Sequence, residues 1–123
     1  MQVVFVAAEV APFAKAGGLG DVVGSLPKAL SGLGIDIAVF APRYREVPPS
    51  LPKTCSLKIE HEGKLKEIQI LQGFLPRSQV PIYFVDFPPY YDRGGIYGDG
   101  DQDYPDNLER FAFLCKVAVI ASA

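Results

Sequence analysis

The sequence predicts an α/β fold of the Rossmann-like kind, with three layers (α/β/α), a mainly parallel sheet and an added β-hairpin. Residues 2–8 form an apolar segment rich in β-branched residues, which is typical of a buried strand. Apolar residues at helical spacing follow over 19–33, and a second apolar run spans 35–41. Strand, helix and strand within roughly 40 residues form a right-handed βαβ unit, so the two strands are expected to be parallel.

The first βαβ unit has clear boundaries. Its first strand is apolar on both faces, so we expect a central strand that is covered by helices on each side. Pro27 lies inside the helical pattern, where it removes a backbone hydrogen bond, and we expect a bend there. Gly34 is placed to end the helix, and Pro42 is placed to end the second strand.

Residues 54–73 interrupt the βαβ rhythm. Glu62-Gly63 predicts a two-residue turn between antiparallel strands 54–61 and 64–73. That register places most apolar side chains on one face, with polar residues pointing to water. The expected apolar pairs are Leu57 with Ile68 and Cys55 with Ile70. We interpret this segment as a structural hairpin at the sheet margin, without chemistry.

The remaining elements complete the layered pattern. Residues 81–87 predict another strand of the parallel type, and 88–105 predict an irregular loop because they are rich in proline, glycine and aspartate. Asp106-x-x-Glu109 resembles a capping box, which predicts a helix from there to the end of the chain. Both faces of this helix are rather apolar. One side carries Leu108, Phe111, Ala112, Cys115, Ala118 and Val119.

Size and composition indicate one globular domain. The 123 residues allow a single core, and 49% hydrophobic with 21% charged residues is typical of a folded chain. A net charge of −2 gives no electrostatic reason to expect nucleic acid or an anionic membrane surface as a partner. No apolar run approaches the roughly 20 residues that span a bilayer. Cys55 and Cys115, in a chain without a signal-peptide pattern, predict free thiols in a reducing cytoplasm.

The stretch Lys15-Ala16-Gly17-Gly18-Leu19-Gly20-Asp21-Val22 joins the first strand to the first helix. The free N–H groups and the positive dipole end of a helix favour an anion at such a position. Glycines leave the backbone accessible to a phosphate, and Lys15 adds a full positive charge. The residues therefore predict a phosphate-binding turn at the carboxyl end of a buried strand.

Two familiar glycine loops fit this stretch less well. A dinucleotide-binding turn needs Gly-x-Gly-x-x-Gly and an acid at the end of the second strand, whereas Asp36 lies at the start of that strand. A nucleotide triphosphatase loop places Gly-Lys-Ser/Thr at the helix start, whereas Lys15 precedes the glycines. A glycine loop that merely turns tightly is the alternative without a ligand.

The exact residue sequence of the loop is more specific than the general features of an anion-binding turn. Lys-x-Gly-Gly-Leu-Gly-Asp-Val, after Ala8-Glu9 and Pro12, resembles the bacterial and plant glycogen and starch synthases. Later stretches agree with that resemblance: Tyr90-Tyr91-Asp92-Arg93, Ile96-Tyr97-Gly98, Asp106-Asn107 and Arg110-Phe111-Ala112-Phe113. The resemblance implies that residues 1–123 are the first part of the N-terminal domain of a two-domain B-type glycosyltransferase, whose C-terminal nucleotide-binding domain is absent here.

The resemblance also implies roles for individual residues. Lys15 is expected to bind the glucosyl-nucleotide donor near its phosphates and sugar, with Gly17 and Gly18 as the backbone cradle. Asp21 either compensates the helix dipole or lies near the sugar, and it is the one candidate for a catalytic residue in this chain. Two further substrate-binding candidates are Glu9, at the end of the first strand, and Tyr97, an aromatic residue that is alternatively only packed in its loop.

The acidic stretch 99–103 and His61 are not predicted to form a metal site or a catalytic site. Asp99-Gly100-Asp101-Gln102-Asp103 fails the calcium-loop pattern, because Tyr104 stands where glycine is needed and Arg110 where the closing glutamate should be. A solvated acidic loop is the better interpretation, and no metal or cofactor is expected. His61 is the single histidine and is expected to be exposed and inert, so a histidine-based dyad is not predicted.

The implied function is the transfer of glucose from ADP-glucose to the non-reducing end of an α-1,4-glucan (glycogen or starch), with retention. Because most charge-stabilising groups belong to the second domain in this family, we expect the chain alone to be inactive. A stand-alone sugar-phosphate or glucan-binding module is one alternative, and a truncated structural fragment is the other. ADP rather than UDP follows from the motif's bacterial and plant spelling. A cytoplasmic location (plastid for a plant protein) follows from the expected free thiols and the lack of a signal-peptide pattern. The last helix and the sheet edge predict self-association.

Overall fold

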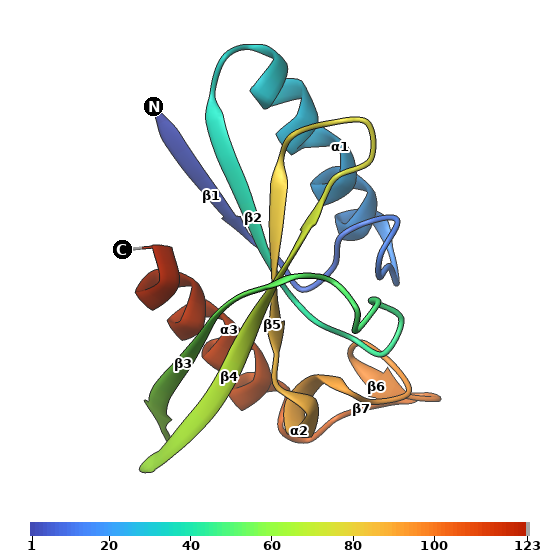
Figure 1. The fold of residues 1–123 in the computed structure, drawn as a ribbon. Coiled ribbons are helices and arrows are strands. Elements are labelled where there is room, and N and C mark those ends of the chain that lie inside the picture. Colours follow the sequence, from blue (N-terminus) through green and yellow to red (C-terminus); the bar gives the residue numbers. More distant parts are fainter. Residues whose placement is uncertain (123) are drawn as a thin grey trace.

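A computed structural model describes residues 1–122 of the chain. Figure 1 shows a twisted central sheet flanked by two long helices. The five strands of this sheet lie in the spatial order β1-β2-β5-β4-β3. The strands are β1 (Gln2–Val6), β2 (Asp36–Pro42), β3 (Lys53–His61), β4 (Lys64–Phe74) and β5 (Pro81–Asp86), and the long helices are α1 (Gly18–Gly32) and α3 (Asn107–Ser122).

The sheet combines a parallel part with an antiparallel hairpin. Strand β2 pairs in parallel with both β1 and β5, and β4 pairs antiparallel with β5 and with β3. Helix α1 packs on one face of the sheet around Val23, Val39 and Phe84. Helix α3 packs on the other face around Ile70 and Phe113. The predicted three-layer α/β/α architecture with an added hairpin is confirmed.

Strand β1 differs from its prediction as a central strand covered on both faces. Within residues 1–122 it lies at the edge of the sheet, with β2 as its hydrogen-bonded neighbour. Val4 and Val6 point to the α3 side and remain 44% and 41% exposed. Helix α3 approaches β1 and β2 on this face but leaves a hollow between its last residues and the two strands, so these side chains keep part of their surface accessible.

The hairpin follows the predicted register. Leu57 pairs with Ile68 and Cys55 with Ile70, and the register shifts once in the described ladder, between Lys53 and Cys55. Glu62 and Gly63 both have positive φ, at 54° and 74°, as a tight hairpin turn of this twist requires. Both thiols, of Cys55 and Cys115, are free and exposed.

Helix α1 ends as predicted, because Gly34 adopts a φ of +86° and its N–H donates to the carbonyl oxygen of Ser31. Pro27 lies within the helix and is buried, while the bend expected at it stays a prediction.

Helix α3 begins just after Asp106, but the carboxylate of Asp106 accepts two hydrogen bonds from Arg93 in place of the expected capping box.

Two further expectations are corrected by packing. The buried side of α3 is formed by Arg110, Phe113, Leu114, Val117 and Ala118, whereas Leu108 and Val119 on the apolar side noted in the sequence are 78% and 70% exposed. Both sides of the helix are apolar, so periodicity alone could not choose between them. The His61 side chain is 12% exposed and packs against the rings of Phe113 and Tyr90, because the hairpin folds beneath α3.

The segment 88–105 is more ordered than the irregular loop that was predicted. It contains the short helix α2 (Pro88–Tyr91), which begins on two prolines, and a small hairpin of β6 (Gly98–Asp99) and β7 (Gln102–Asp103). Asp99, Asp101 and Asp103 are exposed, as expected for a solvated acidic turn. Among the described residues, no helix combines the length and apolarity needed to cross a membrane.

Gly24 provides a test of how α1 is seated. A Cβ at this position would lie 2.7 Å from the backbone oxygen of Ala11, so Gly24→Ala should lower the unfolding free energy by roughly 1–3 kcal/mol through overpacking. Gly32, in the same helix, has open space at its Cβ position, and Gly32→Ala should raise the free energy by roughly 0.5–1 kcal/mol. Urea denaturation measures both, and equal effects of the two changes would contradict this packing.

Candidate functional site at the carboxyl end of β1

The site is organised by Glu9, which lies three residues beyond β1. Its Oε1 accepts hydrogen bonds from the backbone N–H groups of Ala16, Gly17 and Gly20, at N···O distances of 2.9, 2.9 and 3.2 Å. The Glu9 side chain is buried, with 3% of its surface exposed. The N–H groups that the sequence predicts for an anion therefore do bind one, and that anion is the protein's own carboxylate.

The backbone around Glu9 is held by contacts to both neighbouring elements. The N–H of Ala7 donates to Phe40 of β2, and the buried hydroxyl of Tyr44 donates to the carbonyl oxygen of Ala8 at 2.6 Å. The N–H of Ala11 donates to the carbonyl oxygen of Gly20 at 3.0 Å, which ties the chain after Glu9 to the start of α1. These contacts place the carboxylate beneath the glycine loop.

Gly20 allows the close approach of that carboxylate. A Cβ at Gly20 would lie 3.0 Å from Glu9 Oε1 and 3.0 Å from Lys15 Cγ, which is tighter than ordinary van der Waals contact. Gly17 and Gly18, in contrast, have nothing within 4 Å of their Cβ positions. The glycines thus serve two purposes: one admits the carboxylate from inside, and two leave the outer side of the loop bare.

Tyr97 reaches the second oxygen of the same carboxylate. Its hydroxyl donates a short hydrogen bond to Glu9 Oε2, across 88 positions of sequence. The Tyr97 carbonyl oxygen accepts hydrogen bonds from the Asn107 side chain at 2.8 Å and from the Tyr104 N–H at 2.9 Å. Its ring packs against Phe111 at a centroid distance of 5.8 Å. Glu9 and Tyr97 were predicted separately as substrate-binding residues, and the structure brings them into contact.

The protonation states of this pair follow from its surroundings. Burial alone would raise the pKa of Glu9, but the hydrogen bonds from Tyr97 and from the N–H groups of Ala16, Gly17 and Gly20 outweigh it and lower the pKa below 4.5. Burial, together with the hydrogen bond to Glu9 and its negative charge, raises the pKa of Tyr97 above its ordinary value. At neutral pH the carboxylate is therefore ionised and the phenol is a neutral donor.

Arg110 fixes the segment that carries Tyr97. This side chain is fully buried, and its guanidinium donates to the carbonyl oxygens of Tyr90 at 2.7 Å and Ile96 at 2.9 Å, and to Asn107 Oδ1 at 2.7 Å. It also lies over the Tyr104 ring at 4.8 Å. This role of Arg110, which belongs to one of the family-like stretches of the sequence, was not predicted. A lone arginine inside an apolar helical stretch was the available signal.

Lys15 and Asp21 form the outer part of the site. Lys15 Nζ lies 2.9 Å from Asp21 Oδ2, and the two side chains remain 48% and 60% exposed. Together with the bare backbone at Gly17 and Gly18, this exposed ammonium group can receive an anionic group from solvent. All the site residues predicted from the sequence therefore gather at the carboxyl end of β1.

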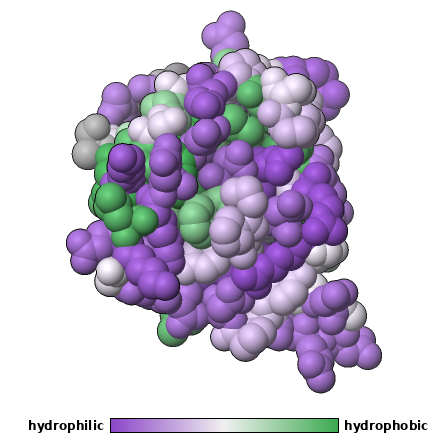
Figure 2. Space-filling view, turned by 60° about the horizontal axis from the view of Figure 1, so that its bottom comes forward, coloured by the Kyte–Doolittle hydropathy of each residue, from purple (hydrophilic) through white to green (hydrophobic). Residues whose placement is uncertain are grey.

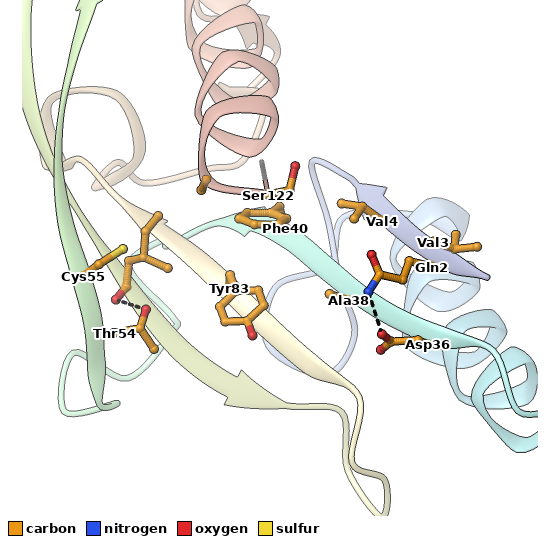
Figure 3. Close-up of a pocket in the computed structure, with 12 residues that line it drawn as sticks. Gln2, Val3, Val4, Asp36, Ala38, Phe40, Thr54, Cys55, Tyr83 and Ser122 are labelled. Carbon is orange, nitrogen blue, oxygen red and sulfur yellow. Dashed lines mark hydrogen bonds between the residues drawn. The ribbon is translucent and has the colours of Figure 1, made fainter.

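A separate hollow of about 380 Å³ lies on the α3 face of the sheet, toward the amino ends of β1 and β2. Figure 3 shows Val4, Phe40 and Tyr83 lining it from the sheet, with Ser122 at its edge from α3. None of the predicted site residues lines this hollow. It is thus a gap in the helical cover of the sheet rather than part of the site.

Comparison with known proteins matches this geometry to one family. The family model of the starch synthase catalytic domain matches residues 2–122. The chain belongs to the starch synthase catalytic domain family. It is 43% identical to a glycogen synthase of Anaeromyxobacter dehalogenans over 97% of its length, and 42% identical to one of Syntrophotalea carbinolica over 93%. It covers 25% and 24% of these two relatives.

A solved structure in this family agrees with the fold. The catalytic domain of starch synthase IV from Arabidopsis thaliana, bound to ADP and acarbose, matches with a TM-score of 0.81 and 31% identity. The match covers 97% of this chain and 25% of that one. The resemblance found in the glycine-loop motif is therefore confirmed, and the chain spans about a quarter of the length of its relatives.

The buried carboxylate makes a specific pH prediction. A lowered pKa means that Glu9 contributes stability that is present above 4.5 and is lost as the pH falls through its folded-state value. At neutral pH, Glu9→Gln should lower the unfolding free energy by roughly 1–3 kcal/mol because charge-assisted hydrogen bonds are lost. The difference should shrink toward zero as the pH falls well below 4.5.

The same substitution at Glu67, an exposed residue of β4, is the control and should show no such dependence. Chemical denaturation over a pH series measures both variants. A difference between wild type and Glu9→Gln that stays constant across the series would contradict the predicted ionisation.

Proposed function

We propose that this segment forms the first part of the N-terminal domain of a glucosyltransferase, which moves glucose from ADP-glucose to the non-reducing end of an α-1,4-glucan with retention. Support comes from the family, from relatives that are glycogen synthases, and from a neighbour bound to ADP and acarbose. The observation that carries the proposal is the exposed Lys15 beside bare glycine backbone at the carboxyl end of a parallel strand, which is where open α/β sheets bind ligands.

Each outer residue has a proposed role in binding the donor. Lys15 contacts the diphosphate and the adjoining sugar, since its ammonium group is accessible and flexible. Gly17 and Gly18 let those groups approach the backbone. Asp21 orients Lys15 through their ion pair and lies next to the sugar, and Tyr97 forms the neighbouring wall.

The described segment does not supply enough positive charge for the reaction by itself. At the loop, the charge of Lys15 is offset by two carboxylates, Asp21 and Glu9, so this one ammonium group cannot neutralise a diphosphate by itself. Stabilisation of the leaving ADP needs further cationic groups. We propose that a second, nucleotide-binding domain of the full-length protein provides them, and that the base is read there, which makes ADP rather than UDP the expected nucleotide on family grounds alone.

Turnover assays test the proposed function. The isolated chain, mixed with ADP-glucose and a glucan primer, should release no ADP above background. A full-length chimera, in which residues 1–123 replace the matching part of the Anaeromyxobacter dehalogenans glycogen synthase, should be active. In that chimera, Lys15→Met should lower kcat/KM by roughly 100-fold or more, because the positive charge that the side chain places beside the diphosphate and the sugar is lost.

Lys58→Met, at an exposed position of β3 in the same chimera, is the matched control and should leave kcat/KM unchanged. Full activity of the Lys15→Met chimera would contradict the proposed role of the lysine. Turnover by the isolated chain at the rate of the chimera would show that no second domain is needed. Binding of a sugar nucleotide by the isolated chain, in a protein that never turns over, would favour the stand-alone module.

We propose a cytoplasmic location, in keeping with the free thiols, and self-association of the chain. Figure 2 shows a patch of hydrophobic surface. The last turns of α3 expose Val119 at 70% and Ile120 at 45%. Val4 and Val6, on the edge strand β1, are also accessible. A second copy of this chain would cover these apolar groups and pair the open edge of β1.

Light scattering at increasing protein concentration tests the self-association. We expect a rise in mean mass that Val119→Lys reduces, while Leu65→Lys, at an exposed position beside the turn of the β3–β4 hairpin, does not. A monodisperse monomer at high concentration would contradict the expectation.

A further inference from the structure

We infer that Glu9 is a positioning residue: its carboxylate stays bound beneath the glycine loop, holds the loop against Tyr97, and presents only the outer side of the loop to the ligand. The assignment of that ligand as a sugar nucleotide rests on the proposed function. The positioning role of Glu9 does not rest on the proposed function, because it concerns contacts within the described chain.

Both oxygens of the Glu9 carboxylate already accept hydrogen bonds within the chain. Oε1 accepts from Ala16, Gly17 and Gly20, and Oε2 accepts from the Tyr97 hydroxyl. A phosphate that took over these N–H groups would have to strip hydrogen bonds from a carboxylate that is 3% exposed. The stripped carboxylate would then remain beside the phosphate with the same sign of charge. Retention of Glu9 in its place avoids both costs.

The glycines of the loop are divided between its inner and its outer side. Gly20 meets Glu9 Oε1 and the Lys15 side chain on the inner side, so its missing side chain is explained by the carboxylate. Gly17 and Gly18 face open space, so the lack of a side chain at these two positions matters only for a ligand that binds the loop from solvent. The loop therefore has an inner side that the protein fills and an outer side that it leaves free.

Glu9 also links the loop to Tyr97. The loop after β1 and the segment 93–106 are separate in sequence, and the Tyr97–Glu9 hydrogen bond joins them at this site. Arg110 holds that segment through Ile96, the residue before Tyr97. Removal of the carboxylate would thus free both the glycine loop and the segment that carries Tyr97. This predicts that Glu9 acts on ligand binding through Lys15 and Tyr97, without touching the ligand.

The free chain provides the first test. Amide hydrogen exchange, measured by NMR on the 123-residue chain, should show protected N–H groups at Ala16, Gly17 and Gly20. Glu9→Gln should speed their exchange by roughly tenfold, while Glu67→Gln should not. Gly20→Ala should have the same effect as Glu9→Gln, because its Cβ displaces the carboxylate. Unchanged protection in both variants would overturn the inference, whatever the protein's function.

The full-length chimera provides the second test, in steady-state kinetics with ADP-glucose. A positioning role predicts that Glu9→Gln raises KM roughly tenfold or more, with a smaller change in kcat, and that Tyr97→Phe gives a weaker effect of the same kind. If the diphosphate instead displaces the Glu9 carboxylate from the N–H groups of the loop, Glu9→Gln should lower KM. That result would overturn the inference. A chimera inactive with wild-type residues 1–123 would contradict the proposed function and leave the exchange test to decide the positioning role.

Discussion

A single buried carboxylate holds the parts of this site together. Glu9 joins the end of β1, the start of α1 and the Tyr97 segment, which are the three pieces of chain that form the site. A buried charge is costly unless it is fully hydrogen-bonded, and here four donors surround it. The same interactions that make the charge tolerable therefore determine the shape of the loop.

The fold delivers these pieces to one place. In a parallel βαβ unit the strand end and the next helix start must meet at one edge of the sheet, so Glu9 and the glycine loop become neighbours by topology. The Tyr97 segment reaches the same edge because it follows β5, which runs parallel to β2. Arg110, buried in α3, then fixes that segment by its carbonyl groups. Parallel pairing and one buried guanidinium thus position the whole site.

Periodicity predicted the elements that bury one face, and the hairpin register followed from its turn and its apolar alternation. The same signals failed where a segment is apolar all round: β1 lies at an edge, and α3 buries a different side from the one noted. The loop's glycines predicted an anion, but pattern alone could not distinguish a bound ligand from Glu9. Arg110 and the buried His61 were missed because burial of a polar side chain depends on partners that are distant in sequence.

The most direct measurement is the scalar coupling across the hydrogen bonds to Glu9, recorded by NMR on the labelled chain. The account predicts measurable couplings between the carboxyl carbon of Glu9 and the amide nitrogens of Ala16 and Gly17, whose N···O distances are 2.9 Å. The couplings should persist in the full-length chimera when ADP-glucose is bound. Their absence in the free chain, under conditions where couplings within the sheet are seen, would contradict it, and so would their disappearance on binding.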